Sequence, residues 1–414
     1  MKRSTIKLGA LLLTASLAMT TVSCKKEGCT DPTATNYSDE ADEDDGSCTF
    51  PDAPVDESEV IVSSNITSNT TWTADKTYIL NTRVSVTAGN TLTIEPGTVI
   101  KGEVGSGPNA TALIIARDAM IMAEGTAAAP IIFTTVADEI ESGQIESPNM
   151  DPTLNGLWGG LIVLGNAPIS ADAQSVQIEG IPASDQNGLY GGTDAADNSG
   201  VITYISIRHG GANIGEGNEI NGLTLGGVGN GTTIENVEIV ANQDDGIEWF
   251  GGTVNVTNAI VWNTGDDAVD TDQAWSGTLD NFIVVNPGDE CMELDGPEGT
   301  GTGSHTIQNG SVSAGGADGL VDLDPNSDLT MNNVYFFNLT TGQDFDELPD
   351  GTGSFTGSNL EATIPTGDAV TDYFMGGSDA FVTSVASGAN TVGADASVLT
   401  SWSWAGVSGS LSGF

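Results

Sequence analysis

A recurring block of acidic and apolar residues is the feature that most constrains what this chain can fold into. Each block places acids after an Asn or Gly turn and then alternates apolar with acidic positions, as in DDGIEWF and DDAVDTD. Equivalent acids at Glu248, Asp270 and Glu293 are 22 and 23 residues apart, and the next, Asp322, follows after 29 residues that include a Gly-rich insertion. A fixed repeat of about this length is typical of stacked coils in a parallel β-helix.

From Val60 onward the chain consists of short strand-like runs separated by turn residues. Short runs such as TYIL, TLTI, ALIIA and GLIVLG are rich in β-branched residues and end at Gly, Asn or Pro, as strands do. The 54 glycines, against 15 prolines, also suit many short strands and turns. We therefore predict an all-β fold with a right-handed parallel β-helix over residues 60–338, followed by C-terminal coils or a cap over residues 339–414.

The N-terminus is typical of an export signal. Three basic residues precede the apolar stretch Leu8 to Met19, which is too short to stop in a bilayer. Residues 1–23 are thus predicted to be a signal peptide. The sequence TVSC, ending at Cys24, resembles the lipobox of bacterial lipoproteins, and this implies lipidation of Cys24 and attachment to the outer membrane or cell surface. An ordinary cleaved signal with a free Cys24 is the alternative.

A compact acidic segment, GCTDPTATNYSDEADEDDGSC, follows the signal. In an exported protein, two cysteines around a short polar stretch indicate a disulfide, here Cys29–Cys48, and closing such a loop stabilises by roughly 3 kcal/mol. Residues 24–59 are predicted to be this module and a linker. The segment resembles modules of secreted proteins from Bacteroidetes-type bacteria. Its oxygen ligands suit calcium, although a solvated acidic spacer would look the same; they are Asp31, Asn36, Asp39, Asp42, Asp44 and Asp45.

Charge excludes one class of partner. The chain has 57 acidic and 10 basic residues, for a formal net charge of −47. Such a field repels nucleic acid and attracts cations, so we expect no nucleic-acid partner.

Strand alternation places the repeated acids on the outside of the coils. Stacked coils are about 4.8 Å apart, where two carboxylates repel by about 0.9 kcal/mol in water. A divalent cation, protonation of some carboxylates, or splaying into water would each make these columns tolerable. One outward column is Glu248, Asp270, Glu293 and Asp322, and a second is Asp272, Asp295 and Asp324. The inward positions are Val269, Thr271, Met292, Leu294, Val321 and Leu323. The candidate calcium ligands are Asp244, Asp245, Asp266, Asp267, Asp270, Asp289 and Glu293.

The same alternation predicts whether other notable side chains lie inside or outside the coils. Cys291 is predicted to be a buried, inert thiol, and His305 is given no role. Trp249 falls in the inward register and is expected in the core. A stacking face for sugars is the alternative fate of the tryptophans; the candidates are Trp158, Trp249, Trp262 and Trp275.

An enzyme is the alternative to a binding protein. The TGDD sequence at Asp266 and Asp267 is similar to the GDD element of polygalacturonases, which use paired carboxylates, but the GHG and RIK elements are absent. A calcium-dependent polysaccharide lyase would need a basic residue near the metal. Arg208 and His209 are the candidates, and their simpler role is to neutralise nearby acids.

Several longer motifs resemble a group of secreted bacterial β-helix proteins with a pectin-lyase-like fold. These include TLTIEPGTVIKG, IMAEGTAAAPIIFTT, GLWGGLIVLGNAPIS, ISIRHGG and DDGIEWFGG. The resemblance implies the fold and an exported location, but the group has no assigned activity. We expect a non-catalytic surface protein that binds polysaccharide or a protein partner and is stiffened by calcium; a β-helix carbohydrate-active enzyme is the alternative.

Overall fold

The computed structural model describes residues 25–50, 58–214, 219–346, 348–349 and 352–414. The chain divides into two compact units, Met1–Asp56 and Glu57–Phe414. Cys24 and the rest of the predicted signal lie outside the described residues. No helix in the described part of the chain is long and apolar enough to cross a membrane.

The first unit is a small disulfide-closed module. The predicted disulfide between Cys29 and Cys48 is confirmed. Beside it, strands β1 (Glu27–Gly28) and β2 (Glu43–Asp44) form a short parallel pair. Exposed ion pairs join Lys25 to Glu43 and Lys26 to Glu40 across the same segment. Because the module has almost no apolar core of its own, the disulfide carries much of its stability.

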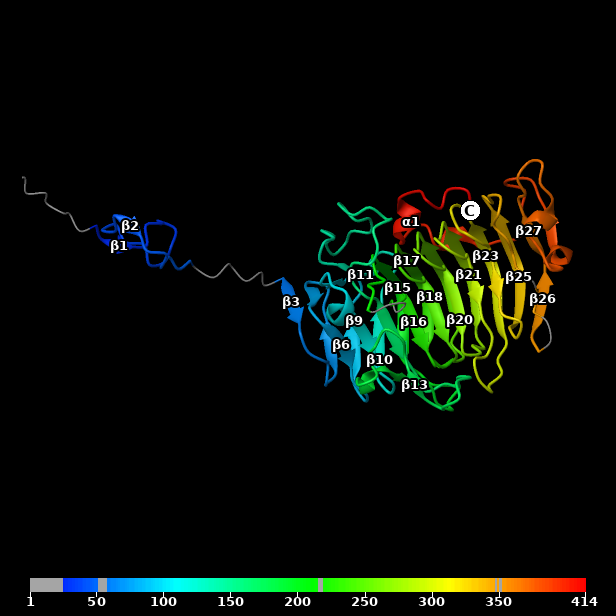
Figure 1. Cartoon of the computed structure of the whole chain (residues 1–414), viewed down its shortest axis with the longest axis horizontal. Helices are drawn as coiled ribbons and strands as arrows, with labels where there is room; N and C mark the ends of the chain where they lie inside the picture. Colours follow the sequence, from blue (N-terminus) through cyan, green and yellow to red (C-terminus); the bar gives the residue numbers. More distant parts are fainter. Residues whose placement is uncertain (1–24, 51–57, 215–218, 347, 350–351) are drawn as a thin grey trace, which may run out of the picture. The chain divides into compact units, whose positions relative to one another are not determined.

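The second unit is a parallel β-helix, which confirms the predicted fold class. Figure 1 shows its strands stacked coil upon coil, and every pairing within its two large sheets is parallel. The sixteen-stranded sheet contains β3 (Glu59–Val62), β4 (Thr70–Trp72), β5 (Thr77–Leu80), β7 (Thr91–Ile94), β8 (Val99–Gly102), β10 (Met120–Glu124), β11 (Ile131–Thr135), β15 (Gly200–Arg208), β17 (Thr233–Val240), β19 (Val256–Trp262), β21 (Thr278–Val285), β23 (His305–Ser313), β25 (Asp328–Phe337), β26 (Ser354–Ser358), β27 (Leu360–Ala362) and β28 (Val382–Ser384).

The eight-stranded sheet forms another side of the helix and carries the acidic repeats. It contains β6 (Arg83–Val86), β9 (Ala112–Ile115), β12 (Leu161–Leu164), β16 (Leu223–Gly226), β18 (Ile247–Phe250), β20 (Val269–Asp272), β22 (Glu293–Leu294) and β24 (Asp322–Leu323). A separate antiparallel pair, β13 (Val176–Gln177) and β14 (Leu189–Tyr190), belongs to the long segment between β12 and β15. Short 3-10 helices occupy connections: η1 (Gly107–Asn109), η2 (Gln186–Gly188), η3 (Val370–Asp372), η4 (Ser378–Phe381) and η5 (Ala396–Val398).

An asparagine in the left-handed conformation bends β17, β19 and β21 of the sixteen-stranded sheet. Asn236, Asn258 and Asn281 occupy equivalent positions with φ of 57°, 62° and 56°, a left-handed conformation that Asn tolerates better than most residues. The side-chain Nδ2 of Asn258 donates to Oδ1 of Asn236 at 3.1 Å, and that of Asn281 donates to Asn258 at 2.7 Å. The amides thus form a ladder along the bend, which fixes the register of neighbouring coils.

Aromatic rings fill the inside of the coils. Trp249 and Trp275 stack with ring centroids 4.6 Å apart, and His305 stacks on Trp275 at 5.2 Å. Trp158 is fully buried in the same core, whereas Trp262 belongs to a separate buried cluster in which its ring packs edge-on against Trp404 near the C-terminus. Cys291 is also fully buried, and burial raises the pKa of its thiol. These tryptophans therefore pack within the protein and leave no stacking face for a sugar.

The chain ends in a strap that runs back along the β-helix. The coils continue past residue 338 to β28, and residues 385–414, here called the C-terminal strap, then cross the outer face of the sixteen-stranded sheet (Figure 1, red). The amide of Ala394 donates to Ser311 on β23 at 2.9 Å, and that of Asp395 donates to Asn281 on β21 at 2.6 Å. Near its end the strap forms the one-turn helix α1 (Trp404–Val407), where the amide of Trp404 donates to Glu238 on β17. It therefore connects coils that are far apart in the sequence.

Candidate functional site

The acidic repeats form a ladder on the outer face of the eight-stranded sheet. In successive strands Glu248 lies opposite Asp270, Asp270 opposite Glu293, and Glu293 opposite Asp322. The inward neighbours predicted from alternation are buried in the core. Glu248 and Asp270 are themselves only 4% and 8% exposed, whereas Glu293 and Asp322 are half-buried. The acids thus point away from the core, but the first two do not splay into water.

A second set of acids lies in the turns that lead into these strands. Oδ1 of Asp245 accepts the amide of Asp267 at 3.0 Å, and Oδ1 of Asp267 accepts the amide of Glu290 at 2.6 Å. Each turn carboxylate therefore caps the next coil. Asp244 and Asp266 beside them are half-buried, and Asp289 is exposed.

The turn acids and ladder acids converge into groups that could hold a metal ion. In two groups, carboxylate oxygens from three residues all lie within 4.8 Å of one another. Hard cations such as calcium take oxygen ligands of this kind. The groups share Asp245; one is Asp244, Asp245 and Asp266, and the other is Asp245, Glu248 and Asp270.

Burial and mutual repulsion shift the protonation of these groups. Burial, with nearby carboxylates adding to it, raises the pKa of Asp244 to about 8 and that of Asp266 to about 6. Burial also raises the pKa of Asp272 to about 7, and it raises the pKa values of Glu248 and Asp270 well above the usual range. No Lys or Arg occurs in the sequence after Arg208, so this part of the chain supplies no permanent positive charge to the ladder.

Asn221, which the sequence did not single out, completes the buried end of the ladder. Its side chain is fully buried, and its Nδ2 donates to Glu248 and, at 3.3 Å, to Glu179. Its Oδ1 has no hydrogen-bond partner among the described residues. An amide oxygen left unpaired beside buried carboxylates is a further oxygen ligand for a cation. Asn221 precedes β16 and lies outside the acidic repeat, so no spacing pointed to it.

The acids of the small module are engaged in their own turns. Asp42 accepts the amide of Lys26 at 3.3 Å, and Asp44 accepts that of Gly46 at 3.2 Å. Asp31 and Asp45 likewise bind Thr33 and Ser47. Among the described residues, the groups of three close carboxylates all lie on the β-helix and none in the module.

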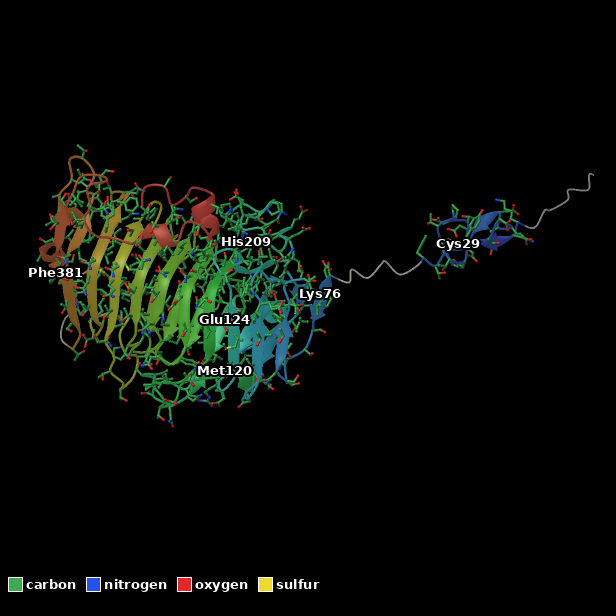
Figure 2. The ribbon with its side chains drawn as sticks, turned by 180° about the vertical axis from the view of Figure 1, so that it is seen from behind. Cys29, Lys76, Met120, Glu124, His209 and Phe381 are labelled. Atoms are coloured by element: carbon green, nitrogen blue, oxygen red, sulfur yellow. A yellow bond between two sulfur atoms is a disulfide. The ribbon has the colours of Figure 1, made fainter. Side chains whose placement is uncertain are left out.

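Arg208 is the last residue of β15 and His209 follows it; Figure 2 shows His209 close to the C-terminal strap, and its ring lies 5.7 Å from that of Trp404. The guanidinium of Arg208 is fully buried, donates to Ser206 Oγ at 2.8 Å and to the carbonyl of Ile145 at 2.6 Å, and stacks over Trp404. His209 is buried, with Nδ1 2.5 Å from the carbonyl of Leu154. Burial lowers the pKa values of both. These contacts hold the strap and nearby loops, and they give no support to a base beside the ladder.

The fold and this site together define a class of protein, a parallel β-helix with a strongly acidic outer face. Comparison with protein families then gives the family: the model of the pectate-lyase-like β-helix domain matches residues 64–396, and the chain belongs to that family. Comparisons with curated proteins and with solved structures give no match.

Proposed function

We propose that this protein is a non-catalytic β-helix scaffold whose acidic ladder binds divalent cations of the calcium class. The observation that carries the proposal is the convergence of buried carboxylate oxygens from Asp245, Glu248 and Asp270 within 4.8 Å. Three like charges in so small a volume repel strongly at low dielectric. A divalent ion would remove that repulsion, and the unpaired Oδ1 of Asn221, whose Nδ2 donates to Glu248, is a candidate further ligand.

Two features favour binding over catalysis. The basic candidates Arg208 and His209 are buried in structural contacts with other elements. The largely exposed aromatic side chains of the described residues are Tyr37 and Phe50, both in the small module, whereas those of the β-helix are buried or half-buried, which disfavours an open aromatic platform for a sugar ring. A polysaccharide or protein partner would instead meet the acidic face through bound cations.

The location follows from the N-terminus. We propose that the protein is exported and anchored by lipid on Cys24 at the outer membrane or cell surface, in the manner of Bacteroidetes-type lipoproteins. Replacing Cys24 with Ser should release the protein from the membrane fraction. Unchanged fractionation would contradict the anchor without touching the cation site.

The cation site is tested by calorimetric titration of calcium into the protein stripped with a chelator. We expect binding with release of protons, because several ladder carboxyls are protonated before the ion enters. Asp270→Asn should weaken the binding at least tenfold. Asp379→Asn is the matched control, because Asp379 is exposed on η4. Equal affinities for the two variants would contradict the proposal.

A carbohydrate-active enzyme is the second candidate. Asp266 and Asp267 are adjacent, and burial raises the pKa of Asp266 to about 6 and that of Asp267 to about 10. Two carboxyls with separated pKa values are what a general acid and base require. Release of reducing ends from an acidic or neutral polysaccharide, lost in Asp266→Asn, would establish this function in place of the scaffold.

A further inference from the structure

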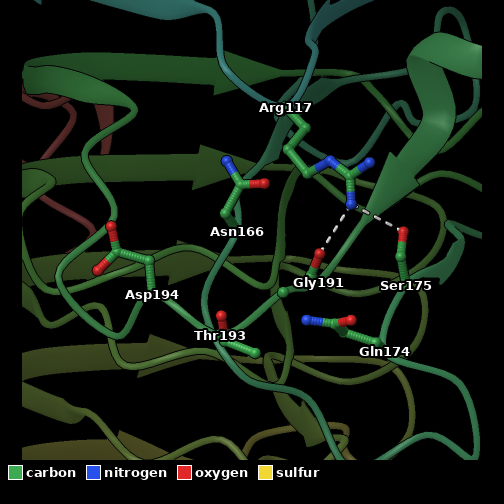
Figure 3. A pocket seen from close by; sticks show the side chains of 8 residues that line it. Arg117, Asn166, Gln174, Ser175, Gly191, Thr193 and Asp194 are labelled. Atoms are coloured by element: carbon green, nitrogen blue, oxygen red, sulfur yellow. Dashed lines mark hydrogen bonds between the residues drawn. The ribbon is translucent and has the colours of Figure 1, made fainter.

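We infer that a polar pocket outside the ladder binds a small organic carboxylate that carries a hydroxyl or amino group next to the carboxylate. The pocket has a volume of about 440 Å³. Arg117, just after β9, and Asn166, just after β12, form one side of it, and residues around Ser175 and Gly191 form the other (Figure 3). This site is independent of the proposed cation centre.

The guanidinium of Arg117 is oriented by two hydrogen bonds and keeps N–H donors free to bind an anion. Its Nη1 donates to Ser175 Oγ at 2.9 Å and to the carbonyl of Gly191 at 2.8 Å, and both acceptors are uncharged. The ion pairs of the described residues join other side chains, so the guanidinium has no carboxylate partner although the chain is strongly acidic. Its orientation is fixed through one nitrogen, and the rest of the planar fork remains for a ligand carboxylate, its preferred anion.

The nearby acids are occupied by other partners. Asn166 Nδ2 donates to Oδ1 of Asp118 at 2.9 Å and to Oδ1 of Asp197 at 3.1 Å. Oδ1 of Asp194 accepts the amide of Ala196 at 3.0 Å. Asp194, which lines the pocket, is thus held in its own turn, and Asp118 and Asp197 bond to Asn166; none of the three forms an ion pair with Arg117 among the described residues. The positive charge is therefore left to the pocket.

The remaining wall supplies neutral hydrogen-bonding groups. The side chains of Gln174 and Thr193 are exposed on the pocket and have no hydrogen-bond partner within the described protein. Figure 3 shows both on the side of the pocket opposite Arg117. An amide and a hydroxyl can pair with a ligand hydroxyl or amino group. A carboxylate with such a group on the adjacent carbon would engage both sides of the pocket at once.

The test uses matched small molecules and the purified protein. Glycolate, lactate, glycine and alanine are compared with glycolamide, which keeps the hydroxyl but lacks the charge, by saturation-transfer NMR and calorimetric titration. We expect at least one hydroxy or amino carboxylate to bind and glycolamide to bind at least tenfold more weakly. Glycolamide binding as well as glycolate, or no binding by any carboxylate at tens of millimolar, would overturn the inference.

Variants separate the pocket from a general charge effect. Arg117→Gln should abolish binding, whereas Lys76→Gln, which removes the same charge elsewhere on the β-helix, should leave it unchanged. Because Arg117 also braces two loops, Gln174→Ala provides a second variant that removes no hydrogen bond of the folded protein; it should weaken binding several-fold. Unchanged affinity in Gln174→Ala, or equal loss in Lys76→Gln, would overturn the assignment.

Discussion

Each of the two large sheets carries buried carboxylates, and the two sheets differ in whether the chain compensates the buried negative charge. Glu238 on the sixteen-stranded sheet is fully buried and is surrounded by donors. It accepts Ser206 Oγ at 2.6 Å and the amides of Trp404 and Ala405 at 3.0 and 2.8 Å, with Arg208 Nη2 at 3.9 Å. The strap and α1 thus compensate this charge from within the chain.

Glu248 and Asp270 on the eight-stranded sheet have almost the same burial but no cationic partner. Among the described residues their neighbours are further acids, and the side-chain amide of Asn221 donates to Glu248. The comparison shows that burial of an acid does not by itself indicate a ligand site. What distinguishes the two is whether the chain itself supplies the compensating charge; in the ladder, the function proposed above assigns that role to a cation.

The largest expected change in stability comes from removing Glu238, the buried carboxylate whose charge the chain itself compensates. Glu238→Ala leaves Arg208 buried without a counter-charge and frees two amides of α1, which should cost about 3 to 5 kcal/mol in the free energy of unfolding. Asp270→Asn, measured without calcium, should instead be neutral or stabilising by about 1 kcal/mol because it removes repulsion. Urea unfolding measures both. Similar losses in the two variants would remove the distinction between the sites.

Calcium should stabilise the protein through the acidic ladder and not through the site of Glu238. A ligand that binds only the folded state adds about 2.7 kcal/mol at 100 times its dissociation constant. Thermal unfolding in calcium should therefore exceed that in chelator at matched ionic strength, and Asp270→Asn should remove most of the gain. The double substitution Asp42→Asn and Asp44→Asn in the small module should keep it. A gain that followed the module would place the effective site there.

The pH dependence of stability sharpens the same contrast. The folded-state pKa values of Asp266, Asp272 and Asp244 are raised to about 6, 7 and 8. A raised carboxyl pKa stabilises the folded state below the unfolded value near 4, and this stability is lost as pH rises through the folded pKa. Without calcium, the free energy of unfolding should therefore fall between pH 5 and pH 8, by about 1.4 kcal/mol for each pH unit over which one of these carboxyls is protonated in the folded state and ionised in the unfolded chain.

Two comparisons check the origin of that fall. Saturating calcium should flatten it, since the ion replaces the protons that the carboxyls would otherwise hold. Below pH 6 a separate loss is expected, because burial lowers the pKa of His305 to about 4 and protonation then favours the unfolded chain. A protein without calcium that becomes more stable from pH 6 to pH 8 would contradict the protonated ladder.

Much of the fold and part of the site could be predicted from local sequence. The 22- and 23-residue intervals set the coil, and alternation then placed Glu248, Asp270 and Glu293 in one column, because both rules depend only on neighbouring residues. The same reasoning left the burial of the ladder open between a cation, protonation and splaying. The structure shows that its first two acids are covered.

The remaining features depend on contacts between distant segments. Asn221 reaches Glu248 from a connection outside the repeat, and Trp404 reaches Glu238 across 166 positions of sequence. Arg208 therefore looked like a candidate base from its position near the repeats, while its actual partners come from a loop and from the strap. No periodic pattern records such pairings, since they are set by where the β-helix brings the chain back.

The smallest expected effect is that of substituting Asp322, the last acid of the column. It tests whether the energetic effect of a ladder acid depends on how deeply that acid is buried. Asp322 continues the column of Asp270 but is half-buried, and burial raises its pKa less than it raises the pKa of Asp270. Solvent screens a partly exposed carboxylate more than a covered one, so Asp322→Asn should change the free energy of unfolding by no more than about 0.5 kcal/mol. Monovalent salt should erase that change, because exposed charges are screened over about 10 Å at 0.1 M, while the effect of Asp270→Asn should persist. If both substitutions respond equally to salt, the whole ladder behaves as solvated surface charge, and the contrast with Glu238 reduces to the presence of the strap.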